Sequence, residues 1–218
     1  MQNAITCNAK AIFKIESRDY EGAFNLLRTS MLSLTETHHG SQRIQETSQA
    51  KSDSIILVSS RFDSNVDRFY SGSFLFSLPL NGMSPECISH RQIDFCSAAC
   101  LFNMALACQL EFESSLDAEK RNKLLSQARI LYLTAYQLMQ KYPIEPTDPI
   151  VLLLMALCGN LIEIELELGS AHEVRFWKRI LEDASYAADP LSFIGSSVYV
   201  FFDSVYIAPG EIRCAKAA

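Results

Sequence analysis

Three cysteines, Cys96, Cys100 and Cys108, lie on one side of a predicted helix, with His90 upstream. Thiolates and imidazoles together are a ligand set that zinc prefers. Structural zinc sites, however, place pairs of cysteines at short spacing on turns, where the thiolates can converge. Here the cysteines are four and eight residues apart in an alanine-rich segment, so we interpret them as small apolar packing groups. We therefore expect no metal and no cofactor.

A nucleophile for covalent catalysis is the next candidate. Gly195 and Ser196 stand in "FIGSSV", which lacks the second glycine and the preceding strand of a nucleophile elbow. The sequence contains no phosphate-binding loop, dinucleotide fingerprint or calcium loop, so we expect no enzyme. The alternative is a helical ligand-binding or enzymatic domain. Its internal pocket would gather cysteine, histidine and carboxylates beneath a β-ribbon lid.

The composition argues against several classes of partner. The 218 residues carry a formal net charge of −6, and the lysines and arginines are scattered among acidic neighbours. A nucleic-acid partner needs a positive field, so none is expected. The most apolar run, residues 150–157, is far shorter than a bilayer span, so no membrane partner is expected. Seven cysteines, an odd number, and no visible secretory signal favour a reducing, cytoplasmic location.

Helical spacing of apolar residues predicts the elements that would position any site. Asp19 is expected to cap the second helix, and Asp148-Pro149 is a start signal for the fifth. Gly169 is expected to end that fifth helix. Because residues 17–19 leave only a short turn, the first two helices must be antiparallel. The predicted helices cover residues 3–16, 20–34, 93–112, 124–142, 150–168 and 171–187.

Two segments interrupt the helices. Residues 35–53 are polar and poor in large apolar groups, so we expect a flexible linker. Residues 54–60 and 68–80 are rich in β-branched or aromatic residues and are bounded by Ser, Asn, Gly and Pro. They are expected to form two short strands, paired as a small ribbon. Self-association through the exposed edges of this ribbon is a third possible role.

A single domain over residues 1–218 is therefore predicted. In its second helix pair, residues 113–122 are expected to form an expanded turn, in which residues 117–123 are either a charged turn or the start of a helix. The expected parts are a first helix pair (1–34), the linker (35–53), the ribbon insertion (54–88), a second helix pair (89–142), a third helix pair (147–187), a terminal helix (189–203) and a tail (204–218).

One pattern of small and large side chains recurs along the chain. Three helices carry an asparagine near the middle, and a turn and a second helix follow each one: Asn8, Asn103 and Asn160. In two of the second helices, an alanine is followed four residues later by a large side chain and then by a small one. These sets are Ala23, Leu27 and Ser30, and Ala128, Tyr132 and Ala135. Small residues at this spacing let antiparallel helices approach closely, while the large one fills the groove to the next pair.

This pattern resembles the tetratricopeptide repeat, a helix-turn-helix unit of about 34 residues. Tyr20 resembles the aromatic residue that opens the second helix of the repeat, and Ala23 its small contact residue. Arg18 stands where the family usually has glycine, and the third unit has Val174 and Lys178 where alanine and an aromatic residue are expected. The layout is also similar to uncharacterised tetratricopeptide-like proteins from diatoms.

The resemblance implies an all-α fold in which antiparallel helix pairs stack as a short right-handed solenoid, with the ribbon between pairs one and two. It also implies a non-catalytic scaffold that binds a protein or peptide in the concave groove formed by the first helices. The residues expected to line that groove are Asn8, Lys10, Asn103, Gln109, Asn160 and Glu163.

Some tetratricopeptide domains bind the C-terminal carboxylate of a partner with lysine and asparagine from these first helices. Asn8 and Asn103 match that type, but Ala4 precedes Asn8 by one turn, and the third unit offers three glutamates that would repel a carboxylate. We therefore expect the asparagines to make local hydrogen bonds. A neutral or basic extended peptide is the easier ligand.

Adjacent aromatic residues, Phe176 and Trp177, stand on the sixth predicted helix among basic neighbours. One of them could be an exposed anchor for a partner. We favour the alternative that both pack in the core.

Overall fold

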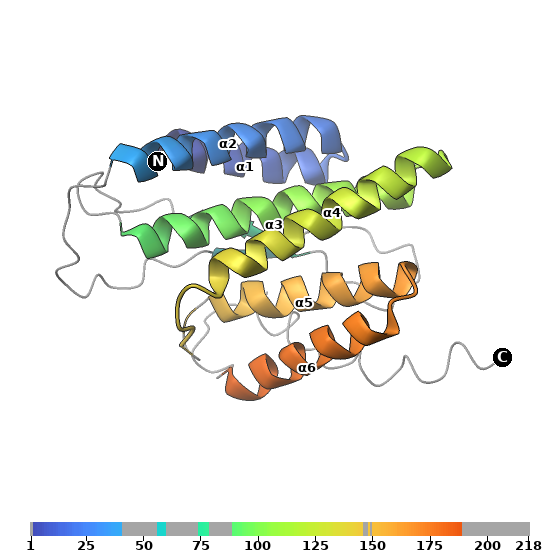
Figure 1. Cartoon of the computed structure of the whole chain (residues 1–218). Coiled ribbons are helices and arrows are strands. Elements are labelled where there is room, and N and C mark those ends of the chain that lie inside the picture. The colour runs from blue at the N-terminus through green and yellow to red at the C-terminus, as the bar shows by residue number, and fades with distance from the viewer. Residues whose placement is uncertain are drawn as a thin grey trace. The chain divides into compact units, whose positions relative to one another are not determined.

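The computed structural model describes residues 2–40, 56–59, 74–78, 89–145, 148 and 150–188. These residues are mostly helical, and neighbouring helices pack in pairs, which confirms the helical class (Figure 1). The strands β1 (Ile56–Ser59) and β2 (Phe74–Ser77) pair in a two-stranded sheet, as predicted for the ribbon. The helices are α1 (Gln2–Glu16), α2 (Tyr20–Gly40), α3 (His90–Ser114), α4 (Ala118–Met139), α5 (Ile150–Glu167) and α6 (Ala171–Ala187).

The chain divides into two compact units. Unit one comprises Met1–Ile56 and Phe76–Ile144, and unit two comprises Leu57–Leu75 and Glu145–Ala218. Unit one therefore contains α1 to α4 with the end of β2, and unit two contains α5 and α6. The predicted terminal helix (189–203) and tail (204–218) lie outside the described residues.

In unit one, each helix packs against its neighbour in the chain. α1 contacts α2, α2 contacts α3, and α3 contacts α4 (Figure 1). The side chains predicted to allow this packing have no exposed surface: Ala23, Leu27 and Ser30 on α2, and Ala128, Tyr132 and Ala135 on α4. The Ser30 hydroxyl also donates a hydrogen bond of 2.8 Å to the Ala4 carbonyl of α1, a contact that a larger residue would prevent.

The turn between α1 and α2 contains a left-handed residue that is not glycine. Arg18 has a φ of 62°, in the left-handed region that glycine adopts at low cost and other residues avoid. The Arg18 N–H donates to the Ile15 carbonyl, and the Asp19 N–H donates to the Lys14 carbonyl, both at 2.9 Å. The backbone therefore has a shape suited to glycine, although the residue is arginine.

Arg18→Gly is expected to stabilise the chain by about 1 kcal/mol, because glycine removes the steric cost of a left-handed residue. For a chain of this length, Tm should rise by about 2–4 °C, which circular dichroism can measure. Arg28→Gly is the control, since Arg28 is exposed within α2 and glycine there is expected to cost about 1 kcal/mol. Equal effects of the two substitutions would contradict strain at position 18.

Asp19 caps α2 as predicted, and its side chain explains Gly22. The Asp19 carboxylate accepts the Gly22 N–H at 2.9 Å and the Lys14 ammonium at 2.6 Å. A Cβ on residue 22 would lie 2.6 Å from Asp19 Oδ2, so any residue but glycine must displace the cap. The hydrogen bonds from Lys14 and Gly22 also lower the pKa of Asp19. The cap is therefore intact at neutral pH and is lost as the pH falls through that lowered pKa.

The effect of Gly22→Ala on the free energy of unfolding is expected to change sign when Asp19 is replaced. In the parent chain, alanine displaces the Asp19 carboxylate and lowers the free energy of unfolding. In an Asp19→Ala background the clash is gone, and alanine raises the stability of α2 by about 1 kcal/mol through its helix propensity. Urea denaturation of the four chains measures both steps. Stabilisation in both backgrounds would show that the Asp19 contact does not require glycine.

Two boundaries differ from the sequence prediction. The linker was expected from residue 35, but α2 continues to Gly40, with Thr35 and Glu36 exposed. Polar side chains do not stop a helix where they are exposed to water, as Thr35 and Glu36 are. The expanded turn expected at residues 113–122 is only Ser115–Asp117, because the Asp117 side chain accepts two backbone N–H groups and caps α4. The charged residues after it form the first turn of that helix.

α3 is covered on every side, and all residues from Ile93 to Leu110 are buried. A helix that is apolar all round belongs in a core. α3 begins at a capping box, in which the Ser89 hydroxyl accepts the Gln92 N–H at 3.2 Å and Gln92 Oε1 accepts the Ser89 N–H at 3.0 Å. Among the described helices, α3 alone is long and apolar enough to cross a membrane, but that apolar stretch is buried inside the protein.

In unit two, α5 packs against α6. Asp148 Oδ1 accepts the Ile150 N–H at 3.1 Å and caps α5 as predicted. Gly169, with a φ of 71°, follows the end of α5, also as predicted. On α6, Trp177 is buried but Phe176 is 44% exposed. The prediction that both pack in the core is therefore wrong for Phe176, because successive helix residues point in different directions.

Candidate functional site

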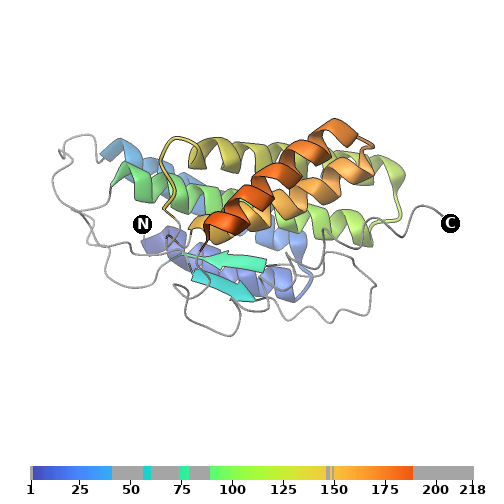
Figure 2. The same cartoon turned by 90° about the horizontal axis from the view of Figure 1, so that it is seen from below.

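The end of β2 lies against α1 and α3, and a buried asparagine from each helix holds it (Figure 2). Asn103 of α3 pairs with both backbone groups of Phe76. Its Oδ1 accepts the Phe76 N–H at 3.1 Å, and its Nδ2 donates to the Phe76 carbonyl at 2.8 Å. A neighbouring β-strand would make two bonds of the same kind, so the amide replaces a strand at this edge of β2.

Asn8 of α1 makes a matching contact two residues further along. Its Oδ1 accepts the Leu78 N–H at 3.2 Å. Alternate residues of an extended chain present their N–H groups to the same edge, so Phe76 and Leu78 face the two asparagines together. All four side chains have no exposed surface. We call Asn8, Asn103 and the bound residues 76–78 the asparagine clamp.

The orientation of the Asn8 amide is set by a chain of buried contacts. Its Nδ2 lies 3.9 Å from Cys100 Sγ, which lies 3.3 Å from Ser30 Oγ. The Ser30 hydroxyl donates its hydrogen to the Ala4 carbonyl, so its oxygen accepts a hydrogen bond from the Cys100 S–H. The Cys100 sulfur in turn accepts a hydrogen bond from Asn8 Nδ2. Asn8 Oδ1 is thereby left as an acceptor facing Leu78. Side chains from α1, α2 and α3 thus preset the clamp.

The Phe76 ring anchors the bound segment against α3. It packs edge-on against Phe102 of α3, with ring centroids 5.1 Å apart, and Phe102 lies 5.3 Å from Tyr132 of α4. The Tyr132 hydroxyl donates to Gln109 Oε1 at 3.0 Å. All three rings are fully buried, so the segment contributes a side chain to the core.

The clamp recognises main chain and not charge. Both amides are neutral, and each turns its oxygen toward a backbone N–H. A carboxylate in the place of either N–H would meet an amide oxygen instead of a donor, so the arrangement does not suit the carboxylate-binding alternative. Nor are these hydrogen bonds local, because their partners are 27 and 70 positions away in the sequence.

The other residues predicted for the groove are placed differently. Lys10 is exposed on α1, and Gln109 is buried in its contact with Tyr132. Asn160 and Glu163 are half-buried on α5 in unit two. The structure therefore brings together Asn8 and Asn103, and it places Gln109 in the α3–α4 interface.

Sequence reasoning missed Phe76, Leu78 and Phe102 as members of the site. A signal was present, because Phe74, Phe76 and Leu78 stand at alternate positions, which is typical of a strand. Leu75, between the two phenylalanines, is also fully buried. Nothing in that pattern identifies the helices on which the strand lies.

Comparison with known proteins gives no relative. No family model, curated protein or solved structure matches the chain. The functional interpretation therefore depends on the clamp and on the paired helices.

The cysteines of the described residues do not form a reactive or metal-binding group. Cys7, Cys96, Cys100, Cys108 and Cys158 are free and buried. Burial raises the pKa of Cys96 and Cys108 to about 12 and that of Cys100 to about 11. The thiolate is the form that attacks substrates and binds metals, and no set of described ligand side chains has the arrangement of a metal site.

We expect these five thiols to resist iodoacetamide at pH 8 in the folded protein and to react once urea unfolds it. Burial acts in this direction for all five thiols, and the raised pKa values of Cys96, Cys100 and Cys108 add to it. Peptide mass spectrometry resolves each site, and reduced glutathione in the same tube is the control for the reagent. Native labelling of Cys100 at the rate of glutathione would contradict its place in the buried chain of contacts.

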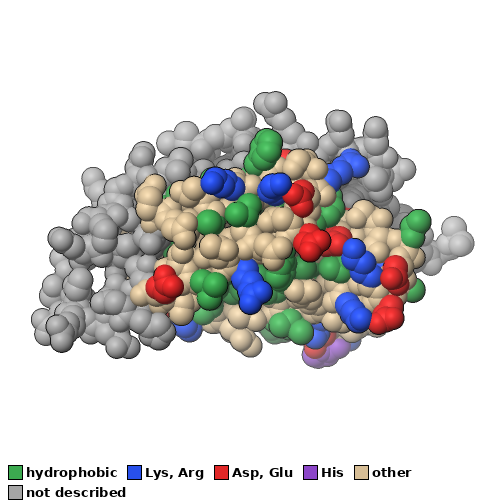
Figure 3. Space-filling view, turned by 90° about the horizontal axis from the view of Figure 1, so that it is seen from above, with side chains coloured by type: hydrophobic (Ala, Val, Ile, Leu, Met, Phe, Trp, Pro, Cys, Tyr) green, Lys and Arg blue, Asp and Glu red, His purple; other side chains and the backbone are tan. Residues whose placement is uncertain are grey.

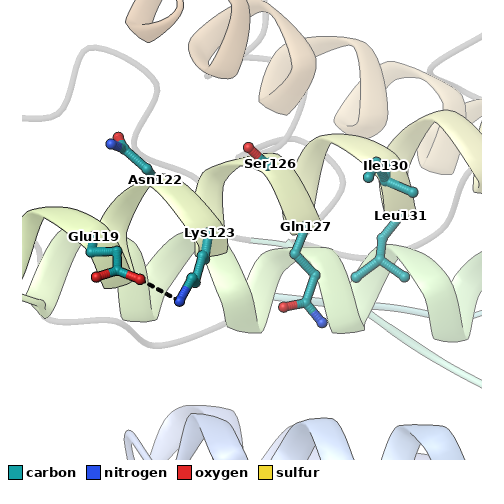
Figure 4. A pocket seen from close by; sticks show the side chains of 7 residues that line it. All are labelled: Glu119, Asn122, Lys123, Ser126, Gln127, Ile130 and Leu131. Atoms are coloured by element: carbon teal, nitrogen blue, oxygen red, sulfur yellow. Dashed lines mark hydrogen bonds and ion pairs between the residues drawn. The ribbon is translucent and has the colours of Figure 1, made fainter.

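A surface hollow of about 520 Å³ lies along α4 and is open to solvent. Figure 4 shows that its labelled side chains come from this single helix, with the Glu119–Lys123 ion pair of 2.6 Å among them. Because none of these lining residues is cysteine or histidine, the hollow does not match the closed pocket of the enzymatic alternative. They are Glu119, Asn122, Lys123, Ser126, Gln127, Ile130 and Leu131.

Acidic and basic side chains are interspersed across the described atoms of the face in Figure 3, with hydrophobic side chains between them. Elsewhere among the described residues, opposite charges pair directly, as in Lys120 with Glu111 at 2.7 Å. Nucleic-acid binding needs a stripe of one sign, and the described part of this face does not present one.

Proposed function

We propose that the chain is a non-catalytic interaction module that holds an extended peptide or protein segment across α1 and α3. The observation that supports this most strongly is the pairing of Asn103 with both the N–H and the carbonyl of Phe76. Those contacts are made to main chain, so an extended segment of another protein can make them too. Asn8 and Asn103 also lie on the first helices of successive pairs, where the tetratricopeptide resemblance predicts a concave groove.

Preset side chains favour binding, because less conformational freedom is lost when the ligand arrives. The Asn8 amide is fixed by Cys100, and Asn103 lies on a helix that is buried on every side. We further propose that the third helix pair continues the stack as a right-handed solenoid. Asn160 and Glu163 of α5 would then extend the groove, and Lys10 of α1 would lie at its rim.

The test is selection of peptides from a displayed library of random 12-residue sequences on the purified full chain. Selected peptides are measured again in the F76A/L78A background, where the chain's own segment competes less for Asn103. In that background, Asn103→Leu removes both amide contacts while keeping the size of the side chain, and Asn25→Leu is the matched control, since Asn25 is exposed on α2. The proposal predicts peptides that bind the background chain and its Asn25→Leu variant equally and lose at least about tenfold in affinity on its Asn103→Leu variant. A selection that yields only peptides indifferent to Asn103 would refute it.

A further inference from the structure

We infer that Phe76, Ser77 and Leu78 occupy the clamp as an internal ligand, and that the partner is an extended segment with the same Phe-x-Leu pattern that must displace them. This inference rests on the proposed function and adds the class of ligand and its regulation. The chain's own segment shows what the surface accepts, residue by residue.

The side-chain requirement follows from burial. Phe76 and Leu78 have no exposed surface, whereas Ser77 between them is half-buried. Phe76 meets the edge of Phe102 inside the α3–α4 interface, where an aromatic ring fits and a small side chain would leave a void. The surface therefore selects an aromatic residue, then any residue, then an aliphatic one.

The backbone requirement follows from the asparagines. The first position must supply an N–H and a carbonyl to Asn103, and the third position must supply an N–H to Asn8. Proline is excluded at both positions because it has no N–H. A C-terminal carboxylate cannot take the place of either N–H, since both amide oxygens require a donor. The ligand is thus an extended stretch that supplies these two N–H groups and the one carbonyl.

Competition between the internal and external segments sets the affinity. A segment tethered to its own binding surface competes at an effective concentration on the order of 1 mM. The apparent affinity for a partner is its affinity for the open surface multiplied by the fraction of molecules in which the internal segment has left. A short free peptide therefore binds the parent weakly, and weakening the internal segment raises the affinity without changing the surface.

The experiment uses the full chain and a fluorescent peptide with its own sequence from residues 72 to 80, GSFLFSLPL. Fluorescence anisotropy measures binding to the parent and to the double variant F76A/L78A. We expect the double variant to bind at least about tenfold more tightly, because its internal segment has lost both buried side chains. If circular dichroism shows that the double variant is unfolded, Leu78→Ala alone replaces it, because this variant keeps the Phe76–Phe102 contact. The same gain in affinity is then expected, but smaller.

Two control peptides separate this mode of binding from simple hydrophobic adhesion. GSFLSFLPL has the same composition but moves the aromatic residue by one position, which turns it to the opposite face of the strand. A peptide N-methylated at the phenylalanine equivalent to Phe76 keeps every side chain but lacks the N–H that Asn103 accepts. Each is expected to bind the double variant at least about tenfold more weakly than GSFLFSLPL.

Equal affinity of GSFLFSLPL for the parent and for the variants would overturn the inference, as would equal binding of the three peptides. A failure of GSFLFSLPL to bind any variant would overturn it as well. None of these three results decides the proposed function, which is tested by the library selection. Library peptides that depend on Asn103 but lack an aromatic-x-aliphatic pattern would leave a peptide-binding module standing without an internal competitor.

Discussion

Ala128→Asp is expected to abolish cooperative folding of unit one. Ala128 has no exposed surface and lies on the buried face of α4 with Tyr132 and Ala135. A carboxylate there must be buried without a partner or must push α4 away from α3. Either outcome costs at least about 3–5 kcal/mol, a large share of the 5–15 kcal/mol that holds a typical domain together.

The measurement is thermal and urea unfolding followed by circular dichroism, with Gln127→Asp as the matched control. Gln127 precedes Ala128 on α4 but is exposed, so the same carboxylate there should change the free energy of unfolding by less than about 0.5 kcal/mol. Melting of Ala128→Asp within one or two degrees of the parent would refute close packing of paired helices through alanine-sized contacts.

The helix pairs could be predicted from the sequence because their cause is local. Ala23, Leu27 and Ser30 repeat the spacing of Ala128, Tyr132 and Ala135, and all six are fully buried. Asp19 and Asp148 were predicted as caps, and both accept backbone N–H groups in the structure. Such signals depend on neighbours within one or two turns, so no knowledge of the tertiary structure is needed.

Some local signals were available but not used. The capping box at Ser89 is visible as "SHRQ", and it would have set the start of α3 at His90. Asp117 stands before the charged segment in the same way that Asp148 stands before α5. Recognising it as a cap would have replaced the expanded turn with the beginning of α4.

The clamp could not be predicted in full, because its contacts join residues far apart in the sequence. Asn8 and Asn103 were predicted to line the groove and to make local hydrogen bonds, but an amide can bond to almost any polar group. That its partners are Phe76 and Leu78 depends on where β2 lies in the folded chain. The role of Cys100 in orienting Asn8 was hidden for the same reason, since a buried cysteine usually acts only as a small apolar group.

Asn103→Leu is expected to lower the free energy of unfolding by about 2–6 kcal/mol. If residues 76–78 stay in place, the Phe76 N–H and carbonyl are buried without partners, at about 1–3 kcal/mol each. If the segment detaches, those groups regain water, but Phe76 and Leu78 lose their burial, at about 1.5–3 kcal/mol each. The cost is therefore similar by either route, and Asn25→Leu on the exposed face of α2 should cost less than about 0.5 kcal/mol.

Hydrogen exchange measured by mass spectrometry separates the two routes. Detachment exposes the Leu78 N–H even though Asn8 is intact, so the whole segment exchanges faster in Asn103→Leu than in the parent. A segment that stays in place retains the Asn8 contact and slow exchange at Leu78. Unchanged stability would show that the Asn103 hydrogen bonds are not needed to hold the strand.

The variant N103D tests whether the Phe76 carbonyl needs a donor from residue 103, because it replaces only the amide nitrogen of Asn103 with oxygen. Its carboxylate would place an oxygen against the Phe76 carbonyl, where Asn103 Nδ2 now donates at 2.8 Å. Repulsion and burial both favour the protonated acid, whose O–H can donate to that carbonyl while the other oxygen accepts the Phe76 N–H. The folded-state pKa of the introduced acid is thus raised above its unfolded value of about 3.9.

For an acid with a raised pKa, the folded state binds more protons than the unfolded state, so stability falls as the pH rises. N103D should therefore approach the parent near pH 4 and lose stability progressively toward pH 7. Urea unfolding of N103D and the parent at each pH gives the difference between their free energies of unfolding. Taking this difference removes the pH dependence that the two chains share. Asn25→Asp, with its exposed carboxylate, should show a nearly constant difference. A constant difference for N103D as well would mean that no donor is required at the Phe76 carbonyl, and the bidentate recognition of main chain by Asn103 would be lost as an argument for peptide binding.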